Sequence, residues 1–222
     1  MASHCIFLLH MNKNINKTQL KELTKFERVN LVNSITGYKS ANLIGSQDTG
    51  GNTNLAIFSS VTHLGSDPAL ITLTLRPNTV ERQTYNNMIN TGFFTVNHVS
   101  SSIIKQAHQT SARYSNEVSE FNATGLKTEY LNNFYAPYVK ESVIKLGCKY
   151  VNSYKIKENG CIIIVASIEE FNYNEAFAEE DYWIRLDKAE TVCVNGLDGY
   201  ALPKLLDRFN YAKPDKEVSS KL

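Results

Sequence analysis

The sequence predicts a mainly β protein with a few inserted helices, folded as a β-barrel with helical covers. Short apolar or alternating runs recur along the chain and are separated by turn signals such as Asp48-Thr-Gly-Gly-Asn52. The strands do not alternate regularly with helices, which disfavours a doubly wound sheet. No GxGxxG sequence follows a strand, so the chain gives no support for a Rossmann dinucleotide site.

Each expected element follows from its local pattern. Thr18 or Asn16 can cap the first helix, and Gly37 ends it. Thr79 is a natural N-cap for a later helix, with Arg82 in its first turn. In order, we expect a helix at 19–36, strands at 40–46 and 53–61, a turn at 64–68, a strand at 69–76, a helix at 80–89, a strand at 93–99, a helix from 101 towards 113, an irregular passage at 114–140, a hairpin with arms 143–154 and 160–171, and a strand at 190–195.

Length and composition fit one domain. A chain of 222 residues, 42% hydrophobic and 20% charged, can bury one sizeable core. No internal repeat or low-complexity linker divides it. We therefore expect a single domain over residues 18–214, a disordered N-terminal extension over 1–17 and a C-terminal tail over 215–222.

Charge and cysteine usage exclude several classes of protein. The formal net charge is +1, so no basic footprint for nucleic acid is present. No apolar run is long enough for a transmembrane helix, and the N-terminus lacks a basic region and a cleavage site. The four cysteines, at 5, 148, 161 and 193, are too far apart for a CxxC pair and are expected to be free thiols. These features predict a cytoplasmic protein.

Known catalytic and metal-binding patterns are absent from the sequence. There is no GxSxG, and a triad of Ser60, His63 and Asp67 would need all three residues from one strand and its turn. The five histidines show no HxH, HxxxH or HExxH spacing, so no metal site is expected.

An anion site is predicted where the polar segment FSSVTHLGSDP lies between two apolar strands. Ser59, Ser60 and Thr62 offer hydroxyl donors where the first strand leaves the sheet. Arg76 ends the next strand, and Arg82 lies near the start of the following helix, whose free N–H groups favour an anion. The alternative is a polar barrel rim with ordinary surface arginines.

Short motifs occur in a fixed order from about residue 18 to residue 214. They are RxNLVNSITGYKS (28–40), NLAIFSS (54–60), HxGSDP (63–68), LRP (75–77), RxTYN (82–86), TGFFTVNH (91–98), AHxTSA (107–112), SEF (119–121), GL (125–126), GLDGY (196–200) and YAxP (211–214). Together they resemble the flavin reductase-like family, in the branch of flavin reductase components of two-component monooxygenases and flavoredoxin-like proteins. The resemblance implies an FMN-binding split β-barrel of the Greek-key type. Ala69 stands where relatives often have a second proline.

The resemblance also implies a set of site residues. Thr62 or His63, at the end of a strand beside the flavin ring, would tune the approach of a nicotinamide and is the candidate for a catalytic role. Backbone groups at Asn54, Val61 and Thr62 would face the ring, and the serines and arginines would bind the phosphate or ribityl chain. The expected cofactor-binding residues are Asn54, Ser59, Ser60, Val61, Thr62, Arg76, Asn78, Thr79 and Arg82.

The function implied by the resemblance is an NAD(P)H:flavin oxidoreductase that passes hydride from a nicotinamide to FMN and on to an acceptor. It also implies a homodimer and an electron-acceptor partner such as a monooxygenase. The aromatic passages 130–138 and 171–183 are candidate subunit contacts. Two alternatives stay open: a flavoredoxin-like FMN electron carrier that reacts with a protein partner, and a non-flavin barrel that binds another anion.

Overall fold

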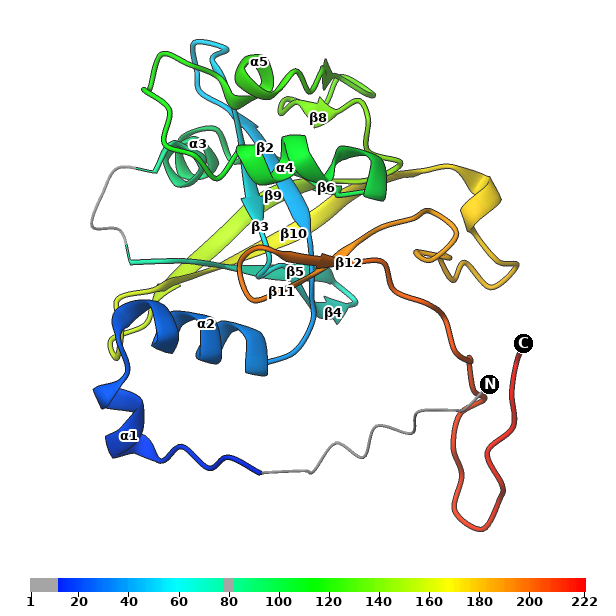
Figure 1. Ribbon diagram of the computed structural model, residues 1–222. Coiled ribbons are helices and arrows are strands. Elements are labelled where there is room, and N and C mark those ends of the chain that lie inside the picture. Colours follow the sequence, from blue (N-terminus) through cyan, green and yellow to red (C-terminus); the bar gives the residue numbers. More distant parts are fainter. Residues whose placement is uncertain (1–11, 78–81) are drawn as a thin grey trace, which may run out of the picture.

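A seven-stranded antiparallel sheet forms the body of the molecule (Figure 1). The computed structural model describes residues 12–77 and 82–222. The strand order is β3-β2-β6-β9-β10-β5-β4, which leaves β3 and β4 at the two edges of a split barrel. The strands are β2 (Asn42–Gln47), β3 (Thr53–Phe58), β4 (Thr62–Ser66), β5 (Ala69–Leu75), β6 (Phe93–His98), β9 (Ile144–Lys155) and β10 (Ile162–Tyr173). The prediction of a mainly β split barrel is confirmed.

Smaller elements surround the barrel. One small sheet holds β1 (Lys39–Ser40), β11 (Cys193–Asn195) and β12 (Gly199–Ala201), and another pairs β7 (Thr128–Glu129) with β8 (Tyr138–Val139). The helices are α1 (Lys17–Glu22), α2 (Lys25–Ile35), α3 (Gln83–Thr91), α4 (Ile104–Gln109) and α5 (Glu120–Thr124), with 3₁₀ turns η1 (Ser101–Ile103) and η2 (Glu175–Phe177). No helix in the described part of the chain has the length and apolar character needed to span a membrane.

Two hydrophobic cores cover the two faces of the sheet. Ile44 belongs to the core inside the barrel, and its neighbour Leu43 belongs to a second core that also contains Ala107 of α4 and Phe121 of α5. The side chains of Leu43 and Ile44 are both fully buried, one in each core, because successive side chains of a strand point to opposite faces. Helices α4 and α5 therefore cover the outer face of β2 and β3.

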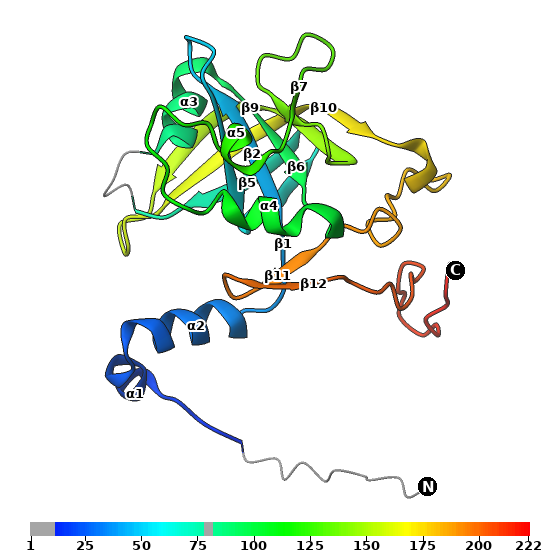
Figure 2. The same cartoon turned by 45° about the horizontal axis from the view of Figure 1, so that its top comes forward.

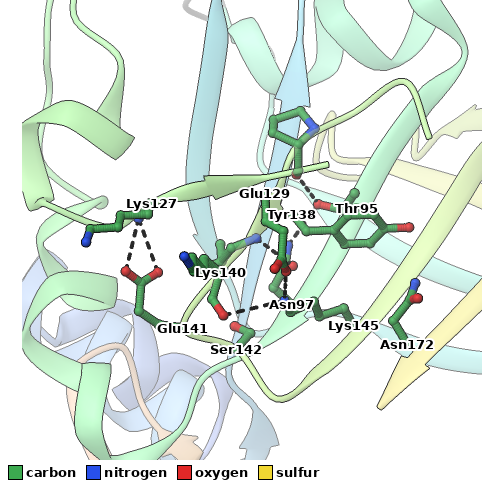
Figure 3. A network of polar contacts seen from close by, with 12 residues as sticks. Thr95, Asn97, Lys127, Glu129, Tyr138, Lys140, Glu141, Ser142, Lys145 and Asn172 are labelled. Carbon is green, nitrogen blue, oxygen red and sulfur yellow. Dashed lines mark hydrogen bonds and ion pairs between the residues drawn. The ribbon is translucent and has the colours of Figure 1, made fainter. Parts of the chain in front are cut away.

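A polar network fixes the segment before β9 to the sheet (Figure 3). Thr95 Oγ1 donates to the Pro137 carbonyl oxygen at 2.7 Å, and Val139 N donates to Asn97 Oδ1 at 2.9 Å. Nearby, the half-buried Glu129 forms an ion pair with the buried Lys145. Buried polar groups form all their hydrogen bonds in only one arrangement of the chain. These contacts therefore hold the segment in a single position on β6.

The structure corrects four expected elements. The first helix is divided into α1 and α2, because Thr24 and Glu27 form a capping box that starts a second helix. The expected turn at 64–68 is mostly β4, since Gly65 and Ser66 pair with β5 and only Asp67-Pro68 turns. Helix α3 begins at Gln83, three residues later than expected. The passage expected to be irregular contains α5, β7 and β8.

Helices α1 and α2 and the C-terminal segment extend away from the barrel (Figures 1 and 2). Helices α1 and α2 contain no buried residue, although Phe26 and Ile35 of α2 are apolar and 80% and 75% exposed. In the C-terminal segment, Leu206 and Tyr211 are 87% and 90% exposed. Of the disordered extension expected over residues 1–17, residues 1–11 lie outside the described residues, whereas Asn16 caps α1 and Lys17 begins it. The single domain over 18–214 stays a prediction.

Candidate functional site

The unpaired edge of β3 is the centre of the candidate site. Leu55 N does not bond to β2 but donates to the Glu120 carboxylate at 2.9 Å. Across the sheet, the Leu43 carbonyl oxygen accepts from Asn97 of β6, so Leu43 directs its backbone groups away from its β3 partner Ile57. Since backbone groups alternate sides along a strand, the N–H of Ile57 points to the same free edge as that of Leu55.

Two contacts place the end of β5 and the start of α3 beside β3. Ser60 Oγ donates to the Thr74 carbonyl oxygen at 2.9 Å and accepts from Thr74 N at 3.0 Å. At the other end, Asn54 Nδ2 donates to Thr84 Oγ1 at 2.9 Å, and both residues are buried. The two ends of the connection from β5 to α3 therefore lie at the two ends of β3.

The two expected arginines lie on this connection. Arg76 is exposed at the end of β5 and forms no ion pair with the described residues. Arg82 is half-buried and donates from Nη2 to the Pro77 carbonyl oxygen at 3.4 Å. Its Nε is shielded from solvent and has no hydrogen-bond partner among the described residues. Such a donor is uncommon, and it points to a partner outside the described residues.

Arg82 is also the N-cap of α3, and not a residue of its first turn as expected. No side-chain hydrogen bond caps this helix end within the described residues. Among the described residues, no side chain accepts from the first N–H groups of α3, and the helix dipole favours an anion there. Asn78 and Thr79, which were expected to brace a phosphate, lie outside the described residues.

The remaining expected residues divide into two groups. Ser59 and Val61 are half-buried in the bend between β3 and β4, and the Val61 carbonyl oxygen accepts from Ser40 Oγ at 3.3 Å. Thr62 and His63 are exposed on β4.

Local hydrogen bonds engage both candidate catalytic side chains. Thr62 Oγ1 lies 2.7 Å from Thr72 Oγ1, and His63 Nε2 lies 3.1 Å from Ser66 Oγ within its own strand. Their catalytic roles stay predictions.

A further histidine lies close to the bend. His98 is the β6 partner of Asn42, which in turn pairs with Phe58. Burial lowers the pKa of His98 to about 4, so its imidazole is neutral at pH 7. Asn42 is 1% exposed, and its Oδ1 has no partner among the described residues.

Sequence reasoning missed Glu120 and the free edge of β3. Glu120 is 9% exposed, and burial raises the pKa of its carboxyl group. It lies 65 residues from Leu55, in a passage without strong periodicity, so no local signal connects the two. Among residues 12–77 and 82–222, no group of three or more His, Cys, Asp or Glu side chains is placed to hold a metal ion.

Comparison with known proteins identifies the class. The model of the flavin reductase like domain matches residues 39–192. The chain therefore belongs to the flavin reductase-like family, as its motifs suggested. No curated protein matches the chain.

Solved structures give the likeness in more detail. The chain is 43% identical to a candidate flavin reductase with a split barrel domain from Shewanella frigidimarina NCIMB 400, with a TM-score of 0.88, and the match covers 90% of this chain and 100% of that one. Nitrilotriacetate monooxygenase component B from Bacillus cereus matches at 21% identity and a TM-score of 0.77, covering 90% and 98% of the two chains. Flavoredoxin of Desulfovibrio vulgaris (Miyazaki F) matches at 20% identity and a TM-score of 0.65, covering 80% and 91%. The last two likenesses concern the fold alone.

Proposed function

We propose that this protein binds FMN and acts as an NAD(P)H:flavin oxidoreductase. The observation that carries the proposal is the orphaned Nε of Arg82 at the uncapped start of α3, beside the free edge of β3. Cationic and N–H donors at one end suit a phosphate, and a row of backbone groups along β3 suits a flat heterocycle with polar edges. Membership of the flavin reductase-like family supports this choice of ligand.

The residues divide the work of binding between them. Arg76, Arg82 and the first N–H groups of α3 would hold the phosphate, with Ser59 close to the ribityl chain. The N–H of Ile57 would donate to the edge of the ring. Ser60 and Asn54 act indirectly, because their side chains fix the connection that presents the arginines.

The protein has little acid–base chemistry to perform. When bound, FMN supplies hydride transfer between a nicotinamide and an acceptor. The chain must orient the ring, keep one of its faces open and place positive charge or N–H groups where negative charge develops. His98 is neutral at pH 7, so it adds no positive charge near the bend between β3 and β4 that would compete with the arginines for the phosphate.

A flavoredoxin-like electron carrier is the second candidate. It is favoured by the match to a flavoredoxin over 80% of this chain. A carrier would keep the same FMN site and differ in its reductant, which would be a protein. A monooxygenase or other electron acceptor is the partner expected of the reductase.

We also propose that the working form is a homodimer. An isolated helix of 11 residues is marginally stable in water, yet α2 forms with its apolar side chains exposed. A second copy would cover these side chains and the exposed C-terminal residues through a two-fold contact. The three described cysteines are free, which suits a reducing cytoplasm.

Two measurements test the proposed function. Purified protein reconstituted with FMN should be yellow, with flavin absorption bands that stay with the protein on gel filtration. Under anaerobic conditions, NADH or NADPH should bleach those bands. Binding without bleaching by either nicotinamide would favour the carrier, and absence of flavin binding would refute both candidates.

A further inference from the structure

The free edge of β3 is closed at one position by a side chain from a distant part of the chain. Glu120, the first residue of α5, accepts from Leu55 N at 2.9 Å. The preceding residue, Ser119, places its Oγ 2.8 Å from Thr53 Oγ1 at the start of β3. Two neighbouring contacts therefore fix α5 on β3, beside the β2–β3 hairpin (Figures 1 and 2).

The geometry points to a positioning role for Glu120, and this inference rests on the proposed function. We propose that Glu120 is a stop that decides where along β3 a flavin ring can dock. Its carboxylate occupies the N–H of Leu55, so a ring that accepts from the strand edge must use the N–H of Ile57.

Such a stop is needed because a strand edge repeats itself. Equivalent N–H groups recur every two residues, about 7 Å apart, which is within the length of a tricyclic ring. Without Glu120, a ring carbonyl could accept from Leu55 or from Ile57, and the ring would bind in two positions. The Glu120 carboxyl oxygen already accepts from Leu55 N and so excludes a ring carbonyl from that N–H, which leaves the position at Ile57.

Burial strengthens this selection. Glu120 is 9% exposed and accepts the hydrogen bond in a site that excludes most water. Thr124 Oγ1 also donates to the Glu120 carbonyl oxygen at 2.7 Å, which supports the short helix that carries the carboxylate. Loss of the acceptor would leave Leu55 N open for a ligand, whereas loss of the charge alone would keep it occupied.

Three full-length variants test the proposal. Glu120→Ala removes the acceptor, Glu120→Gln keeps an acceptor oxygen without the charge, and Ser119→Ala removes the neighbouring contact but leaves the carboxylate. The probe is FMN, with its Kd measured by quenching of flavin fluorescence and its environment by the shape of the visible absorption band. A merely structural role would not alter the band selectively.

We expect Glu120→Ala to broaden or shift the absorption band, as for a ring in two positions. The Kd of FMN should stay the same or fall by about twofold, because a second position adds to the binding constant. Glu120→Gln should stay within about threefold of the wild type, with the native band. Ser119→Ala should match the wild type in both. A wild-type band for Glu120→Ala would overturn the proposal, as would equal band changes in Glu120→Ala and Ser119→Ala.

Folding is checked by circular dichroism. If Glu120→Ala does not fold, Glu120→Asp replaces it, because the shorter side chain draws the carboxylate away from Leu55. The same band change is then expected, and its absence overturns the proposal. Failure of the proposed function would look different, because the wild type itself would bind no FMN.

Discussion

Replacement of Arg82 by methionine should separate binding from stability. The guanidinium makes one long hydrogen bond, from Nη2 to the Pro77 carbonyl oxygen at 3.4 Å, while its Nε is buried without a described partner. Arg82→Met keeps most of the side-chain volume and removes every donor. Loss of the long bond costs little, and removal of an unsatisfied buried donor relieves about 1 kcal/mol. We therefore expect the free energy of unfolding without FMN to be unchanged or about 1 kcal/mol higher.

Binding of FMN should respond in the opposite direction. A hydrogen bond between a guanidinium and a phosphate contributes about 1.5–3 kcal/mol, which corresponds to a Kd raised by about 10- to 150-fold. The free energy of unfolding is measured by urea denaturation, and the Kd by quenching of flavin fluorescence. An unchanged Kd would remove Arg82 from the site.

Arg28 offers a matched control. Its Nη1 donates to the Leu23 carbonyl oxygen at 3.2 Å, so it also makes a single bond to a backbone oxygen, but it lies on α2. Arg28→Met should leave the Kd of FMN within about twofold of the wild type. If both variants weaken binding equally, the effect is one of general charge and the assignment of Arg82 is wrong.

Three further predictions concern stability and assembly. Asn54→Ala leaves the buried Thr84 hydroxyl without its donor and should lower the free energy of unfolding by about 2 kcal/mol in urea denaturation, whereas a change below about 0.5 kcal/mol would mean that water replaces the amide. Burial lowers the pKa of His98 from its ordinary value of 6.5 to about 4. Between these two pH values, His98 of the unfolded chain binds a proton and His98 of the folded chain does not. Stability should fall as the pH drops from about 6.5 to 4, by at most about 3 kcal/mol, and His98→Gln should reduce that loss; equal pH profiles would contradict this. Phe26→Asp combined with Ile35→Asp should convert a dimer to a monomer in sedimentation, and a wild type that is already monomeric would count against the dimer.

The sequence alone determined most of the barrel. The hairpin of β9 and β10 was predicted to within two residues at each strand end, because alternating apolar residues and an Asn-Gly turn specify it locally. The motifs indicated the family, and the family model confirms it over residues 39–192. Two of the expected binding residues lie next to secondary structure elements, because Arg76 follows β5 and Arg82 precedes α3, while their binding roles stay predictions.

Which strand edge is free, and which side chain closes it, follows from the three-dimensional arrangement of the strands. Leu55 and Glu120 are 65 residues apart. Ser60 contacts Thr74 on the far side of β4, a strand that the sequence patterns did not predict. Gly65 and Ser66 were expected in a turn, yet pairing with β5 makes them part of an edge strand. Strand pairing joins residues that are distant in the chain, so the edges of a sheet depend on its final order and not on local propensity.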